Sequence, residues 1–269
     1  MLERVRERGL VLLGCGKMGS ALLEGWLRQG VPPESVTVIE PHPSDWLRST
    51  GVALNTGLPP SPAIVLLAVK PQMMGAALPA VTALGGGTTV FLSIAAGTTI
   101  ASFETAFGPA TPIIRAMPNT PAAVARGITA IIGNARASEA DLALAETLLS
   151  AVGQVVRLER EDQMDAVTAV SGSGPAYVFH LIEALAAAGV AQGLPEALAM
   201  QLARATVCGA GELAHQSAET AAQLRINVTS PGGTTAAALS VLMAPDTGLP
   251  PLMARAVQAA ADRGRELGK

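Results

Sequence analysis

The sequence predicts an α/β fold, in which a doubly wound parallel sheet is followed by a second, all-helical domain. Three observations predict it. Short apolar runs alternate with helical patterns over roughly the first 160 residues. A glycine-rich turn joins the first of these runs to the first helical pattern. Beyond residue 160, long alanine- and leucine-rich segments replace the runs, so we expect two domains, 1–160 and 161–269.

The expected strands are short and follow one another along the first half of the chain, at 9–14, 35–40, 63–69, 88–93, 112–115, 128–132 and 155–158. Helical patterns lie between them, at 20–29, 72–84, 98–107 and 138–152. The run 63–69 is apolar throughout, which is typical of a strand buried on both faces of a parallel sheet. Strands that alternate with helices predict a doubly wound sheet.

The second half shows helical segments only, at 164–188, 195–215, 234–243 and 250–266. A helical domain with so much alanine and so few charges rarely closes a core of its own. We therefore expect its apolar faces to pack against a second copy of the chain. A monomer with unusually tight alanine packing is the alternative.

The composition excludes several classes of protein. Apolar residues make up 49% of the chain and charged residues 14%, which is not the composition of a disordered chain. A net charge of −3 and 3% aromatic residues leave neither the basic surface nor the stacking rings that nucleic-acid binding needs. The longest apolar stretch, 178–194, is interrupted by polar residues and glycines, so no membrane span is expected.

The N-terminus and the cysteines predict a cytoplasmic protein without a metal site. Glu3 and Glu7 interleave the N-terminal arginines, which is not the pattern of a signal peptide. Cys15 and Cys208 show no metal-binding spacing and are expected to be free thiols in a reducing compartment.

The segment Gly14-Cys15-Gly16-Lys17-Met18-Gly19 predicts a dinucleotide site, because it follows a strand and opens a helix. Gly14 would allow the tight turn, Gly16 the approach of a pyrophosphate, and Gly19 close packing of the helix on the sheet. The N–H groups of the first helical turn would then point at phosphate oxygens. The alternative is a glycine turn without a ligand.

Glu40 ends the second expected strand, where an acidic side chain can accept hydrogen bonds from the adenosine ribose and repel a 2′-phosphate. No Arg or Lys occurs at 41–44, so the residues themselves favour NADH over NADPH. A solvated glutamate at a strand end is the alternative. Lys70 and the small residues of 93–97 end the next two strands, where they are expected to meet the cofactor.

Two glycine-rich segments interrupt the helical half, at 171–175 and 229–235. The second combines a Pro-Gly-Gly turn with two threonines at a helix start. Such a turn offers unpaired N–H groups and hydroxyls, which suit a small carboxylate. A plain helix cap is the alternative, although a single Ser or Thr would satisfy it without two glycines.

The motifs GCGKMG, AVKP, SIAAG, RAMPNTP, SGSGPAY and VTSPGGTTAAAL resemble the pyrroline-5-carboxylate reductase family over residues 10–266. The resemblance implies an N-terminal Rossmann domain and a C-terminal helical domain that interleaves with a partner subunit. It also implies a homodimer, often gathered into larger rings. The implied reaction is hydride transfer from NADPH or NADH to the imine carbon of Δ1-pyrroline-5-carboxylate, which gives L-proline.

The resemblance and the site arguments together give the expected site residues. Those expected to bind the cofactor are Leu13, Gly14, Gly16, Lys17, Met18, Gly19, Glu40, Asn55, Ala68, Val69, Lys70, Pro71, Ile94, Ala95 and Ala96. Those expected to bind the substrate are Asn227, Gly232, Gly233, Thr234 and Thr235. The segment before SPGG lacks the His-Pro pair that the family often shows, which leaves Glu219 as a weak acidic candidate.

Thr235 and Ser230 are the expected catalytic residues, with Ser173 as a further donor. A cyclic imine can arrive already protonated, so positioning and electrostatics can suffice. The substrate carboxylate would sit on the N–H groups of 233–235, and the Thr235 hydroxyl would hold the imine over the nicotinamide. The alternatives are another imine or hydroxyacid reductase of the same plan, or a non-catalytic dinucleotide-sensing protein. The hydroxyacid dehydrogenases use a second-domain lysine, and none lies between Lys70 and Lys269.

Overall fold

The computed structural model describes residues 2–267, and these residues group into two compact units. The first unit holds the described residues up to Gly172 together with those from Ala261 onward, and the second comprises Ser173–Ala260. This grouping reflects contacts within one chain, whereas the boundary expected near residue 160 concerns cofactor binding and dimerisation. That boundary stays a prediction.

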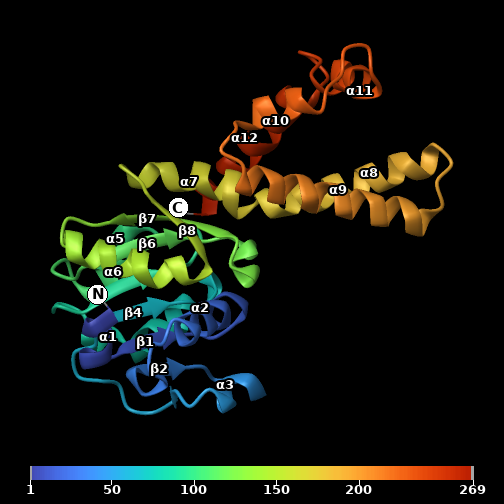
Figure 1. The fold of residues 1–269 in the computed structure, drawn as a ribbon. Helices are drawn as coiled ribbons and strands as arrows, with labels where there is room; N and C mark the ends of the chain where they lie inside the picture. Colours follow the sequence, from blue (N-terminus) through green and yellow to red (C-terminus); the bar gives the residue numbers. More distant parts are fainter. Residues whose placement is uncertain (1, 268–269) are drawn as a thin grey trace. The chain divides into compact units, whose positions relative to one another are not determined.

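An eight-stranded sheet organises the first unit (Figure 1). Its strands are β1 Leu10–Leu13, β2 Val36–Ile39, β3 Ala53–Leu54, β4 Ile64–Leu67, β5 Val90–Ser93, β6 Ile113–Met117, β7 Gly127–Gly133 and β8 Gly153–Arg157. The order across the sheet is β3-β2-β1-β4-β5-β6-β7-β8, and every pair is parallel except β6 with β7. The chain leaves β1 in one direction toward β3 and returns to its other side at β4. The point between β1 and β4 is therefore a topological switch point.

The helices of the first unit are α1 Leu2–Arg8, α2 Lys17–Arg28, α3 Asp45–Ser49, α4 Met74–Ala77, α5 Ile100–Phe107, α6 Glu139–Leu149 and α7 Met164–Val167. The second unit holds α8 Gly174–Ala191, α9 Glu196–Gln216, α10 Ala221–Asn227 and α11 Thr234–Leu242. Helix α12, Leu249–Leu267, begins in the second unit, and its residues from Ala261 onward group with the first.

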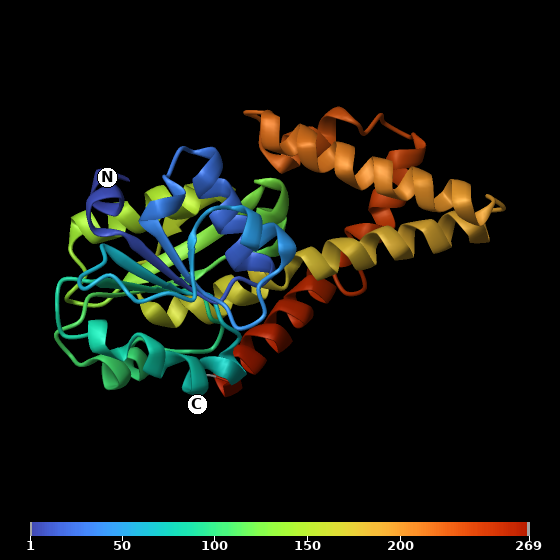
Figure 2. The ribbon, with the colours of Figure 1, turned by 90° about the horizontal axis from the view of Figure 1, so that it is seen from below.

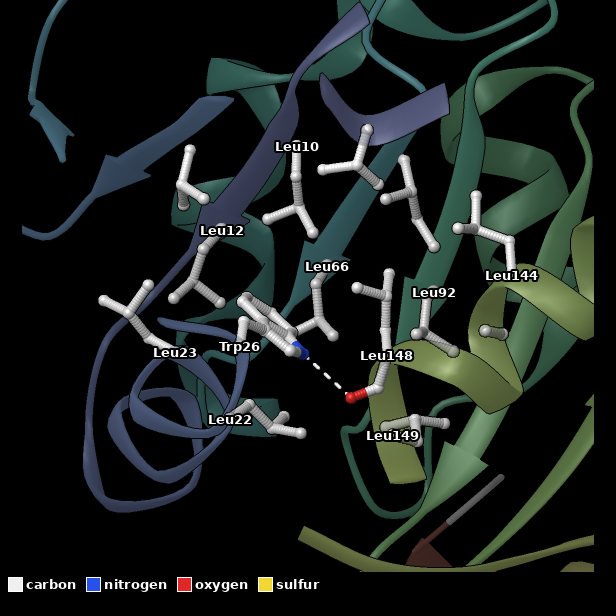
Figure 3. Close-up of a cluster of buried hydrophobic side chains, with 14 of the residues drawn as sticks. Leu10, Leu12, Leu22, Leu23, Trp26, Leu66, Leu92, Leu144, Leu148 and Leu149 are labelled. Atoms are coloured by element: carbon white, nitrogen blue, oxygen red, sulfur yellow. Dashed lines mark hydrogen bonds between the residues drawn. The ribbon is translucent and has the colours of Figure 1, made fainter. Parts of the chain in front are cut away.

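Helices cover both faces of the sheet, as a doubly wound fold requires (Figure 2). Alternate residues of one strand enter different cores: Leu10 and Leu12 pack with α2 and α6, whereas Val11 and Leu13 pack with α4 and α5. The larger core is centred on Trp26, whose ring N–H donates to the backbone oxygen of Leu148 at 2.8 Å (Figure 3). This bond satisfies the one polar atom of a fully buried ring.

The structure corrects the helix expected over 72–84. Only α4 is α-helical there, and short 3-10 turns surround it. Gly75 and Pro79 interrupt the segment, because glycine lowers helix stability and proline removes a backbone donor. The sequence reasoning also missed α1, α3, α10 and the two-residue β3, and it did not foresee that β7 runs antiparallel.

Helices α8 and α9 form an antiparallel hairpin in the second unit (Figure 1). Its large apolar side chains are widely exposed, among them Val178, Phe179, Leu181, Leu202 and Leu213. Within the described residues one helical stretch, Glu161–Ala191, is long and apolar enough to cross a membrane, which by itself is weak evidence for a span. Large apolar side chains exposed along a pair of helices are typical of an interface.

Asp141 joins the N-terminal helix to α6. Its Oδ1 accepts a hydrogen bond from Arg4 at 2.7 Å, and its Oδ2 accepts from the Ser138 N–H at 3.0 Å in a capping box. Burial raises the pKa of the Asp141 carboxyl, but hydrogen bonds from Ser138 and Arg4 outweigh burial and leave the pKa below its usual value. The charged form therefore stabilises the fold.

We expect the Asp141→Asn variant to be less stable than wild type by about 1–2 kcal/mol at pH 7, because the cap and the ion pair both weaken. Since the folded pKa is lowered, the charged Asp141 contributes stability above its unfolded pKa of about 3.9. That contribution is lost as the pH falls through the folded pKa. Urea denaturation between pH 3 and 7 should show the difference shrinking toward acid. Asp162→Asn, which removes an exposed ion pair with Arg160, should show little difference at any pH.

Candidate functional site

The sheet brings most of the expected cofactor residues to one edge. Leu13 pairs with Ile39 on one side and with Leu67 on the other, and Leu67 pairs with Ser93. These residues end β1, β2, β4 and β5, so the segments that follow them meet at the carboxyl edge of the sheet. The glycine motif, Glu40, 68–71 and 94–96 are those segments. This edge includes the switch point, where open α/β sheets bind ligands.

The glycine motif has the geometry of a dinucleotide turn. Gly14 has a φ of +90°, and an added Cβ would lie 2.8 Å from Cγ1 of Val69, so only glycine fits. An added Cβ at Gly19 would lie 2.5 Å from the backbone oxygen of Gly14. Because glycine has no Cβ, α2 can begin close against the turn. Nothing in the described chain lies within 4 Å of a Cβ built on Gly16.

Helix α2 begins without a capping side chain. Gly16 is its N-cap residue and Lys17 its first, and both are exposed. The N–H groups of the first helical turn have no partner within the helix, and they carry the positive end of its dipole. Open space above Gly16 and uncapped amides beside it can hold a pyrophosphate.

Glu40 follows β2 and bonds back to the glycine motif. Its Oε2 accepts a hydrogen bond from the backbone N–H of Cys15 at 2.7 Å, and its Oε1 accepts from the backbone N–H of His42 at 3.0 Å. Burial and, secondarily, the Glu40 charge raise the pKa of the Cys15 thiol to about 11. Cys15 therefore stays a protonated thiol at neutral pH, and its backbone N–H is one of the groups that hold Glu40.

Asn55 lies directly after β3 with a positive φ of 52°, a conformation that asparagine tolerates better than most residues. Its Oδ1 accepts from the backbone N–H of Glu40, and its Nδ2 donates to the backbone oxygen of Glu40, both at 2.9 Å. The structure thus brings Asn55 to Glu40, which the sequence had proposed only as separate contacts to the cofactor.

The remaining loops of the edge are short and fixed. Ala68 and Val69 are half-buried, whereas Lys70 is exposed and precedes a 3-10 turn that starts at Pro71. In the next loop, Ile94 and Ala95 lie closer to the core than the exposed Ala96. Lys17 and Lys70 therefore both present ammonium groups to solvent at this edge.

An ion pair beside the 94–97 loop escaped the sequence reasoning. Arg115 of β6 is almost fully buried, and its guanidinium donates to Oε1 of Glu161 at 2.9 Å. The same oxygen accepts from the backbone N–H of Ile100, so Glu161 also caps α5 at 2.9 Å. An arginine inside an apolar strand was the available signal, but its partner lies far along the sequence.

The second unit contains another uncapped helix start. Gly233 is the N-cap residue of α11, no side chain caps it among the described residues, and Gly232 turns the chain with a φ of +69°. Thr234 opens the helix and is exposed, whereas Thr235 is half-buried. Ser230 is exposed, and its backbone oxygen accepts from Gly233 N–H at 3.0 Å to close the turn.

Asn227, the last residue of α10, is held by its neighbours. Its Nδ2 donates to Oε2 of Glu219 at 3.0 Å, and its Oδ1 accepts from Gln223 at 2.8 Å. The structure thus pairs the expected substrate residue Asn227 with the acidic candidate Glu219. The part of the chain that the structure describes holds no group of three His, Cys, Asp or Glu residues suited to a metal ion.

Two family models match the chain. One, described as pyrroline-5-carboxylate reductase dimerisation, matches residues 161–267, and the other, described as NADP oxidoreductase coenzyme F420-dependent, matches residues 10–97. A pyrroline-5-carboxylate reductase of Synechocystis is 43% identical and covers 97% of this chain and 98% of its own. That of Pseudomonas aeruginosa is 38% identical and covers 97% of each.

Solved structures agree with these matches. A pyrroline-5-carboxylate reductase from Coxiella burnetii superposes with a TM-score of 0.91 at 34% identity, covering 97% of this chain and 99% of that one. A Plasmodium falciparum pyrroline carboxylate reductase with NADP bound gives a TM-score of 0.81 at 29% identity, covering 98% and 99%.

The open space at Gly16 gives a test of the cofactor site. We expect Gly16→Val to fold with a melting temperature close to that of wild type, because its Cβ meets nothing in the protein. Its side chain would fill the space for the pyrophosphate, so the Kd for a reduced dinucleotide should rise by about 100-fold or more. Nucleotide fluorescence titration measures this. Gly75→Ala, whose added Cβ is equally uncrowded but lies in α4, should bind normally. Unchanged binding by Gly16→Val would remove the glycine motif from the site.

Proposed function

Because the chain belongs to the pyrroline-5-carboxylate reductase family, we propose an assignment of its residues to the reduction of Δ1-pyrroline-5-carboxylate to L-proline. The protein is an NAD(P)H-dependent oxidoreductase that acts on a C=N bond. These relatives do not favour the alternatives, which were another imine or hydroxyacid reductase of the same plan and a non-catalytic dinucleotide-sensing protein.

The cofactor is assigned to the carboxyl edge of the sheet. The observation that supports this most directly is the open space above Gly16, beside a start of α2 that no described side chain caps. Lys17 and Lys70 would offset phosphate charge, and the small residues Ala95 and Ala96 would leave room for the nicotinamide half. When bound, the reduced dinucleotide supplies a hydride.

The substrate carboxylate is assigned to the start of α11. The N–H groups of Thr234 and Thr235 offer an anion site there, with Gly232 turning the backbone toward it. The Gly233 N–H, which was also expected to bind the carboxylate, donates instead to the Ser230 oxygen at 3.0 Å. The Thr235 hydroxyl would bond the ring nitrogen or the carboxylate and fix the orientation of the imine. Ser230 and Ser173 would be secondary donors.

A protonated imine needs little acid catalysis, so the proposed role of the protein is positioning and electrostatic stabilisation. Glu219 is the acidic candidate in the second unit, and Asn227 of the expected substrate site donates to its Oε2 at 3.0 Å. A carboxylate held in this way could stabilise the iminium charge before hydride transfer.

Residues 161–267 match a dimerisation domain, and the chain is expected to work as an oligomer on a small-molecule substrate. We propose a homodimer, gathered into a larger ring, in the cytoplasm and without a membrane partner. The exposed apolar side chains of α8 and α9 support this proposal, because a second copy of the chain would cover them.

Glu40 supports a preference for NADH. Its carboxylate would accept hydrogen bonds from the adenosine ribose and would repel a 2′-phosphate, and no Arg or Lys follows at 41–44. The family model that matches residues 10–97 and the solved Plasmodium falciparum structure both have NADP in their names. The preference for NADH is therefore proposed for this chain alone.

Thr235→Ala should lower kcat/KM for pyrroline-5-carboxylate by about 10²–10³, in the range of losing one preorganised donor. Absorbance at 340 nm follows the reaction. Thr235→Ser keeps the hydroxyl and should retain most of the activity. Wild-type turnover by Thr235→Ala would remove this side chain from the mechanism.

Glu40→Gln should lower the ratio of kcat/KM for NADH to that for NADPH by about tenfold, because a charge that repels the 2′-phosphate is removed. Steady-state rates with the two cofactors at fixed substrate measure this ratio. A strong preference of the wild-type protein for NADPH would contradict the role given to Glu40.

A further inference from the structure

We propose that Asn55 is a positioning residue for cofactor discrimination: it fixes Glu40, and through Glu40 it sets the preference between NADH and NADPH. This inference rests on the proposed cofactor role of Glu40. It changes the role expected from the sequence, in which Asn55 itself would contact the cofactor near the adenosine ribose.

The first support is the way Asn55 extends the sheet. Strands β2 and β3 pair through Thr37 with Ala53 and Val38 with Leu54, and the Asn55 N–H donates to the Val38 oxygen at 2.8 Å. The positive φ of Asn55 then turns its backbone away. Its side-chain amide replaces the lost peptide group, accepting from and donating to the backbone of Glu40 at 2.9 Å each. The amide thus continues the ladder by one residue.

The second support is that every polar group of Glu40 is engaged. Asn55 holds its N–H and its backbone oxygen, while Cys15 and His42 hold its two carboxylate oxygens at 2.7 and 3.0 Å. A carboxylate has about four acceptor positions, so positions remain for two ribose hydroxyls. Because both the backbone and the carboxylate of Glu40 are hydrogen-bonded, the side chain cannot move aside to relieve repulsion from a 2′-phosphate.

The third support is that the Asn55 side chain uses most of its hydrogen-bonding groups on Glu40. Its one acceptor and one of its two N–H donors face Glu40. An amide that is bonded to Glu40 in this way affects the cofactor through Glu40. Removing it should loosen Glu40, weaken its bonds to the ribose and reduce its repulsion of the 2′-phosphate, so the two cofactors should become more alike.

The test is a double-mutant cycle with Asn55→Gly and Glu40→Gln. Glycine adopts a φ of 52° without strain, so Asn55→Gly removes the side chain and leaves the backbone. With pyrroline-5-carboxylate as substrate, Asn55→Gly should lower the NADH to NADPH ratio of kcat/KM by roughly three- to tenfold. The ratio should fall no further when Asn55→Gly is added to Glu40→Gln.

The other outcomes overturn the inference. Asn55→Gly could instead lower kcat/KM equally with both cofactors, in addition to the effect of Glu40→Gln. That result would mean that Asn55 contacts the cofactor directly. A lower melting temperature with an unchanged ratio would mean a purely structural role. Thr50→Ala, which removes a hydrogen bond to the Leu47 oxygen in the same connection, is the matched control and should leave the ratio unchanged.

Two further results distinguish the roles of Glu40 and Asn55 from the reductase activity itself. If Glu40→Gln leaves the ratio unchanged, the role of Glu40 fails and the inference fails with it, whereas the reductase activity stands. If Asn55→Gly does not fold, Asn55→Asp, which tolerates the same φ and loses the donor to the Glu40 oxygen, is tested in its place. Failure of both variants to fold would show that the amide holds the fold rather than the specificity.

Discussion

The close approach of backbone to backbone at the turn after β1 is the constraint on which the rest depends. Gly14 lies against Ala68 and Val69, and Gly19 lies against the oxygen of Gly14, with no room for a Cβ at either position. This contact sets where α2 begins and aligns its amides with the ends of β2 and β4. Larger residues there would displace the loops that carry Glu40 and Lys70 from the common edge.

The two proposed anion sites, one in each half of the chain, use the same structural element. The protein has three lysines, Lys17, Lys70 and Lys269, and none lies near the turn at 229–235 in the sequence. Within the described residues, each site is a helix start that no side chain caps, at Gly16 beside Lys17 and at Gly233 with no lysine nearby in the sequence. Backbone amides are fixed by the fold and lose little entropy on binding, which suits chemistry that depends on orientation.

Local patterns predicted much of this structure because they are local in origin. The apolar run 63–69 and the glycine motif carry their own signals, and the structure placed β4 and α2 where these signals pointed. Features that depend on distant partners were not predictable. Glu161 meets Arg115 and Asn55 meets Glu40 only after folding. The breaks at 72–84 were readable from Gly75 and Pro79, but the apolar pattern outweighed them. Which residues touch the ligands remains a prediction.

The uncovered side chains of α8 and α9 have a consequence for how the protein reaches its final state. Phe179, Leu181 and Leu213 lie outside any core that a single chain provides. In the proposed homodimer a second copy of the chain would bury them, so completion of the fold and assembly would obey one mass-action equilibrium. Dilution would then shift the thermal midpoint downward, and newly made chains would keep this apolar surface exposed for longest when they are scarce.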